Sequence, residues 1–197
     1  MGLAVRLSKH YAVLIGSREE ARAHKSAEQV KGISGGSVLG CTNGDAAGAC
    51  EVAILAIPDL PTPEMLRELA PSLRGKLVIS PIVPMKFHDG VFSYTLREGS
   101  AAEKVASALQ ARVASALHTV PAEKLLKLDQ ALELDVLVAA DSRETFVETA
   151  ELVSKIERLR PLHAGPLGVS RMVESITPLL LNVGRFNKIR SPSIRIV

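Results

Sequence analysis

Short apolar segments separated by helical stretches constrain the fold of this chain more than any other feature. The clearest is Glu51–Ile57, whose apolar residues are continuous rather than alternating with polar ones. A strand of this kind is buried on both faces, which favours a central position in a parallel sheet. Strands that alternate with helices are typical of α/β proteins. We therefore expect a doubly wound, mostly parallel sheet with helices on both faces and a small C-terminal helical segment.

The spacing of apolar residues and the capping residues assign the other elements. The expected strands are Tyr11–Ile15, 38–41, 51–57, 76–80, 112–117 and 135–139, with an extended segment at 160–164. The expected helices are 1–10, 19–30, 43–50, 63–73, 100–109, 122–128, 141–159 and 169–186. Thr62 before Pro63, and Ser100 three residues before Glu103, are helix-starting patterns. Segments 31–37 and 85–99 are expected to be loops, the second a candidate lid over the sheet edge.

Composition narrows the class of protein. A chain of 197 residues fits one domain of ordinary size, and its net charge of +3 comes without a run of Lys and Arg, so we expect no nucleic-acid partner. Cys41 and Cys50 lack the close spacing of metal or redox motifs, which indicates reduced thiols, a cytoplasmic location and no metal site. No apolar run approaches the ~20 residues of a membrane span.

The end of the first expected strand contains the sharpest indication of a ligand. Ser17 and Arg18 follow an expected tight turn at Gly16. Ligands of open α/β sheets bind at the carboxyl ends of the strands. An acidic residue here would bind the ribose 2′-hydroxyl of NAD, whereas a hydroxyl and a guanidinium suit the 2′-phosphate of NADP. The alternative is that Ser17 caps the next helix and Arg18 is merely solvated.

Several further motifs stand at the ends of expected strands or in the last helix. They are Leu55-Ala-Ile57-Pro58, Ser80-Pro-Ile-Val-Pro84, Ser115-Ala-Leu-His118-Thr-Val-Pro121, Gly165-Pro166-Leu167 and Arg171-x-x-Glu174-Ser-x-Thr-Pro178-Leu-x-Leu-Asn182. With Gly16-Ser17-Arg18, and in this order, they make the chain resemble the NADPH-dependent coenzyme F420 reductase family over nearly its whole length. The resemblance implies a Rossmann-like NADP-binding domain at 1–164. It also implies that a C-terminal helix and tail at 165–197 help to hold coenzyme F420, and that the protein is a homodimer.

The resemblance also assigns roles to residues. Ser17 and Arg18 match the 2′-phosphate binders, and Ile57 and Pro58 match the strand end beside the nicotinamide or ribose. The residues that match the walls of the family's F420 pocket are Pro81, Val83, Pro84, Ala116, Leu117 and His118. Hydride transfer between two cofactors needs stacking and exclusion of water rather than a general base, so no catalytic side chain is expected. For His118, a hydrogen bond to the deazaflavin or to a phosphate and a purely structural role remain equal alternatives.

The expected last helix, 169–186, has a wide apolar stripe. It consists of Val169, Met172, Val173, Ile176, Leu179, Leu180 and Val183. Such a stripe is either a dimer interface or a seam within the chain. Pro178 should bend the helix, and we expect Glu174 to pair with Arg171 or a neighbour. The tail 193–197 alternates weakly and could add a strand to a sheet edge.

The sequence departs from the family pattern at its start. Family members begin with a strand and a Gly-rich turn that binds the pyrophosphate, and here the sequence begins within the helix that follows that turn. Strands 11–15 and 51–57, expected in one sheet, must then pair with each other, admit another segment or keep open edges. A start assigned too late, a shortened member that binds NADP poorly, and a gap filled by 193–197 all remain open. The alternative to an enzyme is a non-catalytic dimeric Rossmann-fold remnant that binds nucleotide weakly or not at all.

Overall fold

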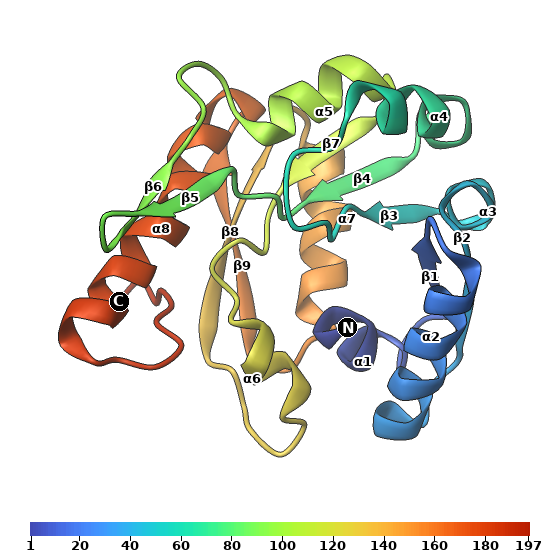
Figure 1. Ribbon diagram of the computed structural model, residues 1–197, viewed down its shortest axis with the longest axis horizontal. Coiled ribbons are helices and arrows are strands. Elements are labelled where there is room, and N and C mark those ends of the chain that lie inside the picture. Colours follow the sequence, from blue (N-terminus) through green and yellow to red (C-terminus); the bar gives the residue numbers. More distant parts are fainter.

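A five-stranded sheet forms the centre of the computed structural model, which describes residues 1–197 (Figure 1). Its strands, in spatial order, are β3 (Val52–Ile54), β4 (Leu77–Ser80), β7 (Arg112–Ser115), β8 (Leu134–Ala140) and β9 (Leu159–Gly165). All neighbouring pairs are parallel except β7 and β8, which are antiparallel. The predicted α/β class with a mostly parallel sheet is therefore confirmed.

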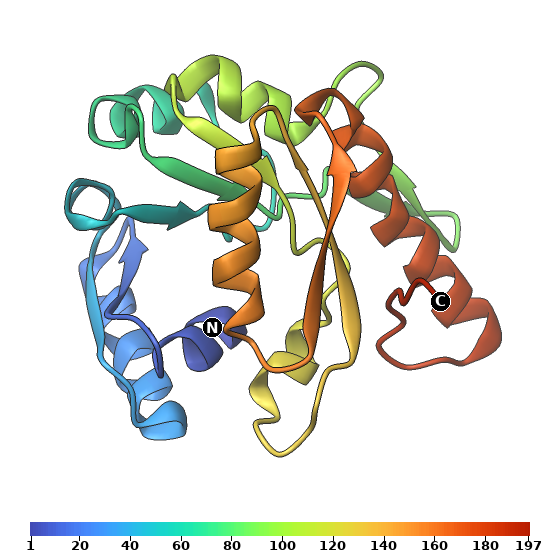
Figure 2. The ribbon, with the colours of Figure 1, turned by 180° about the vertical axis from the view of Figure 1, so that it is seen from behind.

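Strand β4 shows how the two faces of the sheet are covered. Leu77 and Ile79 belong to an apolar cluster that includes Val153 of helix α7 (Arg143–Ser154). Val78 belongs to a second cluster, with α4 (Pro63–Leu73) and α5 (Ala101–Leu109). Successive side chains of a strand point to opposite faces, so the two clusters lie on opposite sides of the sheet. In Figure 2, α7 crosses the side nearer the viewer.

The first part of the chain forms a small two-stranded sheet with three helices, separate from the main sheet. Its elements are α1 (Gly2–Leu7), β1 (Val13–Ser17), α2 (Glu20–Ser34), β2 (Val38–Thr42) and α3 (Asn43–Ala49). Strands β1 and β2 pair in parallel with each other and with no strand of the five-stranded sheet. The expectation that one sheet contains all the strands is therefore wrong. Of the three outcomes considered for β1 and β3, the structure shows open edges.

Several boundaries of this first part also differ from the prediction. The first strand begins two residues later than expected, so that Gly16 lies within it and Ser17 ends it. Helix α2 continues to Ser34, through half of the expected loop. Strand β3 is shorter than expected because the backbone turns after Ile54, where the amide of Ala56 donates to the Ile54 carbonyl. The prediction that this strand is buried in a central position is wrong, because β3 lies at the edge of the main sheet, bonds only to β4 and is half-buried.

Segment 85–99, expected to be a loop, instead contains an antiparallel hairpin of β5 (Met85–His88) and β6 (Val91–Tyr94). Asp89 and Gly90 make its turn with positive φ angles of 50° and 81°. An Asp-Gly pair is a strong hairpin signal, so the sequence contained the evidence that would have corrected this prediction. The amide of Asn182 exchanges two hydrogen bonds with the backbone of Phe92, of 2.7 and 2.8 Å. The hairpin is therefore fastened to the last helix.

The C-terminal part packs along the main sheet. After β9 the chain forms a short 3-10 turn (Leu167–Val169) and then helix α8 (Ser170–Asn187). The short helix α6 (Ala122–Leu126) comes earlier, between β7 and β8. The tail after α8 forms no strand. It lies against β8, where the amide of Asp135 donates to the Ile194 carbonyl at 3.0 Å. It therefore does not fill the space between β1 and β3. None of the helices is long and apolar enough to cross a bilayer.

Candidate functional site

The carboxyl ends of three strands come together at one edge of the main sheet. Leu55 donates from its amide to the Ile79 carbonyl at 3.0 Å, and Ala116 donates to the Ser80 carbonyl at 3.2 Å. Ser80 and Ser115 are partners in register. The three predicted segments that leave these strands therefore begin side by side. These segments are Ile57–Pro58, Pro81–Pro84 and Ala116–His118.

The fourth predicted segment, Ser17–Arg18, lies at the end of β1 in the separate small sheet. Ser17 is half-buried, and its hydroxyl accepts a hydrogen bond of 3.2 Å from the amide of Glu19. Glu19 is the residue that precedes the helix, so Ser17 shapes the turn rather than capping α2. Arg18 is exposed, and its guanidinium makes no hydrogen bond or ion pair. A cation without a protein partner is available to an anionic ligand.

His118 is the most perturbed group at the main edge. Its side chain is 9% exposed, and burial lowers its pKa to about 4, so the imidazole is neutral at pH 7. Nε2 lies 3.5 Å from the Ser115 hydroxyl, whereas Nδ1 has no partner. The hydroxyls of Ser80 and Ser170 are also buried without partners. Buried polar atoms normally have partners, so these three enclosed atoms are exceptions to the usual rule.

The turn that carries His118 is held by the C-terminal part of the chain. Leu117 has a φ of 73°, a left-handed conformation that is costly for a residue with a side chain. The hydroxyl of Thr177 donates to the His118 carbonyl at 3.0 Å, and that of Ser193 donates to the Thr119 carbonyl at 2.7 Å. Sequence reasoning missed both hydroxyls, since no local pattern marks a contact over such a separation.

Glu174 fastens three elements near this edge. Its carboxylate, fully buried, accepts hydrogen bonds from the Tyr94 hydroxyl at 2.6 Å and from the first amides of α5, Ala101 at 3.0 Å and Ala102 at 3.1 Å. Burial raises the pKa of Glu174 and also that of Tyr94. Of the partners expected for Glu174, Arg171 or a neighbour, Arg171 is not one. That guanidinium lies over the Tyr94 ring, 5.7 Å from its centre.

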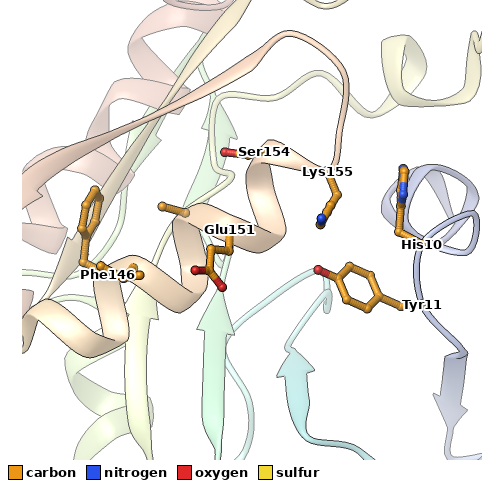
Figure 3. A pocket seen from close by; sticks show the side chains of 8 residues that line it. His10, Tyr11, Phe146, Glu151, Ser154 and Lys155 are labelled. Atoms are coloured by element: carbon orange, nitrogen blue, oxygen red, sulfur yellow. The ribbon is translucent and has the colours of Figure 1, made fainter.

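Two hollows lie away from the predicted residues. One, of about 790 Å³, separates the turn His10–Tyr11 from α7 between Phe146 and Lys155 (Figure 3). The other, of about 310 Å³, lies on the exposed side of α8 beside Met172 and Leu179. No group of three or more His, Cys, Asp or Glu side chains is arranged to hold a metal ion.

Comparisons with known proteins then decide the family. Residues 1–84 match the family described as NADP oxidoreductase, coenzyme F420-dependent. The F420-dependent NADP reductase of Methanothermobacter thermautotrophicus is 37% identical over 206 residues, covering 100% of this chain and 89% of that protein. This chain belongs to the F420-dependent NADP reductase family. The reductase of Methanocaldococcus jannaschii is 34% identical over 205 residues, covering 99% of this chain and 92% of that protein.

Solved structures agree with the fold of this F420-dependent NADP reductase family member. A candidate F420-dependent NADP reductase from Arthrobacter sp. FB24 superposes with a TM-score of 0.83 at 20% identity, covering 100% of this chain and 93% of that one. The resemblance found in the sequence motifs is therefore confirmed at the level of family and fold.

Proposed function

We propose that this protein transfers a hydride between NADP(H) and the deazaflavin coenzyme F420. The observation that carries the proposal is the similarity over the full chain to reductases of that name. The two cofactors supply the hydride donor and acceptor, and the protein's own residues bind them, orient them and exclude water. The non-catalytic alternative is not favoured, because the relatives that match the whole chain are enzymes.

Ser17 and Arg18 are proposed to bind the 2′-phosphate of NADP. The support is the unpartnered guanidinium at the carboxyl end of β1, beside a hydroxyl that is engaged only with the next turn. A planar guanidinium matches phosphate oxygens with two parallel donors. After the end of β3, Ile57 is half-buried and Pro58 is exposed. Both are proposed to contact the nicotinamide or its ribose.

The segments after β4 and β7 are proposed to form the F420 pocket. Pro81, Val83 and Pro84 supply one wall, which is stiff because proline fixes the backbone φ. Ala116, Leu117 and His118 supply the other, and all three are buried. The unpartnered buried atoms of Ser80, His118 and Ser170 fit a polar ring system. A neutral imidazole can donate or accept a hydrogen bond without introducing charge.

We also propose the larger organisation predicted from the sequence. Residues 1–164 would hold NADP, and residues 165–197 would complete the F420 pocket and form a homodimer. The dimer is supported by the exposed part of the apolar stripe of α8, where Met172 and Leu179 are 67% and 60% exposed, and by Phe186, two turns after Leu179, which is 68% exposed. A cytoplasmic location is supported by the two free cysteines.

The test measures hydride transfer between NADPH and F420 in the presence of the purified chain. The reaction is monitored as the loss of F420 absorbance on reduction, or as its gain in the reverse direction. Turnover with NADPH is expected, and no nucleotide binding at millimolar NADPH would contradict the proposal. Arg18→Ala should weaken NADPH binding about tenfold, because the site is exposed, and leave NADH binding unchanged. Arg22→Ala, at an exposed arginine of the following helix, is the matched control. Equal losses for NADPH and NADH would reject the role of Arg18.

A further inference from the structure

The carboxyl ends of β1 and β2 lie side by side in the small sheet. The two strands are parallel, and Ser17 of β1 is the register partner of Thr42 of β2. The residues that follow them, Arg18 and Asn43, therefore leave the same edge of this sheet, where ligands of open α/β sheets bind. Figure 1 shows α3, which begins at Asn43, beside the tip of the β1 arrow.

Asn43 lies over the end of β1 rather than in open solvent. The residue is half-buried. A Cβ atom on Gly16 would stand 3.0 Å from Oδ1 of Asn43 and 3.2 Å from its Cα, closer than side chains normally approach. The absence of a side chain at Gly16 therefore allows the Asn43 amide to approach the turn that carries Ser17 and Arg18.

The polar groups around Asn43 differ in what they are free to bind. The Thr42 hydroxyl caps α3, because it accepts a hydrogen bond from the Asp45 amide at 3.1 Å and donates one to the Asp45 carboxylate at 2.6 Å. The Ser17 hydroxyl accepts from the amide of Glu19. The side-chain amide of Asn43 makes no hydrogen bond with the rest of the chain, so its two N–H donors are free for a ligand.

The charges at this edge make the neutrality of residue 43 important. Burial raises the pKa of the Cys41 thiol, and the carboxylates of Asp45 and Glu20 raise it further, so both carboxylates lie close to the end of β2. The guanidinium of Arg18 therefore shares this edge with two negative charges. A carboxylate at residue 43 would add a third and repel a phosphate, whereas an amide of the same shape donates a hydrogen bond to it.

We propose that Asn43 is a specificity-determining residue for NADP, because its amide donates a hydrogen bond to the 2′-phosphate beside Ser17 and Arg18. This inference rests on the proposed binding of the 2′-phosphate by that pair. A hydrogen bond to a charged phosphate is stronger than one to the neutral 2′-hydroxyl of NAD, so the amide favours NADP. An aspartate at this position shifts the preference toward NAD, since a carboxylate repels the phosphate and accepts a hydrogen bond from the 2′-hydroxyl.

The experiment measures binding of NADPH and NADH, which differ only in the 2′-phosphate, by fluorescence titration of the full chain. The variants are Asn43→Ala, which removes the amide, and Asn43→Asp, which replaces it with a carboxylate. An acidic residue in the first turn of a helix is favourable, so Asn43→Asp should fold, and urea unfolding checks this. The matched control, Gln29→Glu, adds the same single negative charge at an exposed position farther along α2.

We expect Asn43→Ala to weaken NADPH binding about tenfold, and Asn43→Asp to weaken it at least as much. NADH binding should stay within about twofold in Asn43→Ala and become no weaker in Asn43→Asp, and the control should leave both nucleotides unchanged. Unchanged NADPH binding in both variants, or equal losses for the two nucleotides, would overturn the role of Asn43 while the unsubstituted chain still prefers NADPH. An unsubstituted chain that binds NADPH no more tightly than NADH would instead contradict the proposed 2′-phosphate site itself, and the role of Asn43 with it.

Discussion

Acid should destabilise this protein through one buried imidazole. His118 has an ordinary pKa of 6.5 and a pKa of about 4 in the folded chain, because burial disfavours the charged ring. Between these values the unfolded chain binds a proton that the folded chain does not, so stability falls as the pH falls from 6.5 toward 4. Each pKa unit is worth about 1.4 kcal/mol, which makes the total about 3 kcal/mol. Above 6.5 and below about 4 this contribution is constant.

The assay is urea unfolding of the protein and of His118→Asn at pH 7 and at pH 4, since asparagine does not titrate. We expect the unsubstituted protein to lose about 3 kcal/mol more than the variant. The other histidines are exposed: His10, His24, His88 and His163. Arg160 lowers the pKa of Asp135 to about 2, so protonation of Asp135 affects stability only below the pH range of this assay. The raised pKa of Glu174 affects the stability of the protein and of the variant equally, so it cancels in the comparison. Identical pH dependence of the two proteins would refute a buried, neutral His118.

Three other substitutions, one of them with a control, test the packing. Arg6→Met removes a buried guanidinium that donates to four carbonyl groups at the end of α6 and just beyond it, so we expect a loss of about 2–4 kcal/mol in urea unfolding. Exposed ion pairs contribute about 1 kcal/mol or less, so a measured loss below about 1 kcal/mol would contradict a buried, stabilising role for Arg6. Gly40→Ala places a methyl group 2.4 Å from the backbone of α2 and should cost about 1–3 kcal/mol. Gly48→Ala, inside helix α3 with open space around it, should instead leave stability unchanged or raise it by up to about 1 kcal/mol. Asn182→Ala should speed amide exchange at Phe92, and unchanged exchange would show that the hairpin is held by other contacts.

Features with a local cause were predictable from the sequence. The continuous apolar run of Glu51–Ile57 predicted a strand, and β3 lies within it, although at the edge of the sheet and half-buried rather than central. Thr62 and Ser100 were predicted to start helices, and each accepts a hydrogen bond from an amide three residues later. The motifs at the strand ends identified the family, because residues at such ends depend on the ligand more than on the core.

The sequence by itself therefore determined the fold class, the positions of the main-sheet strands along the chain and the family, since these depend on periodicity, caps and short motifs. Only the tertiary structure decided that β1 stands apart from β3, that Glu174 binds α5 and Tyr94 rather than Arg171, and that His118 is buried without a partner for Nδ1. The physical reason is the same in each case. A hydrogen bond between distant segments, or its absence, depends on which groups the packed chain places side by side, and no local pattern records that.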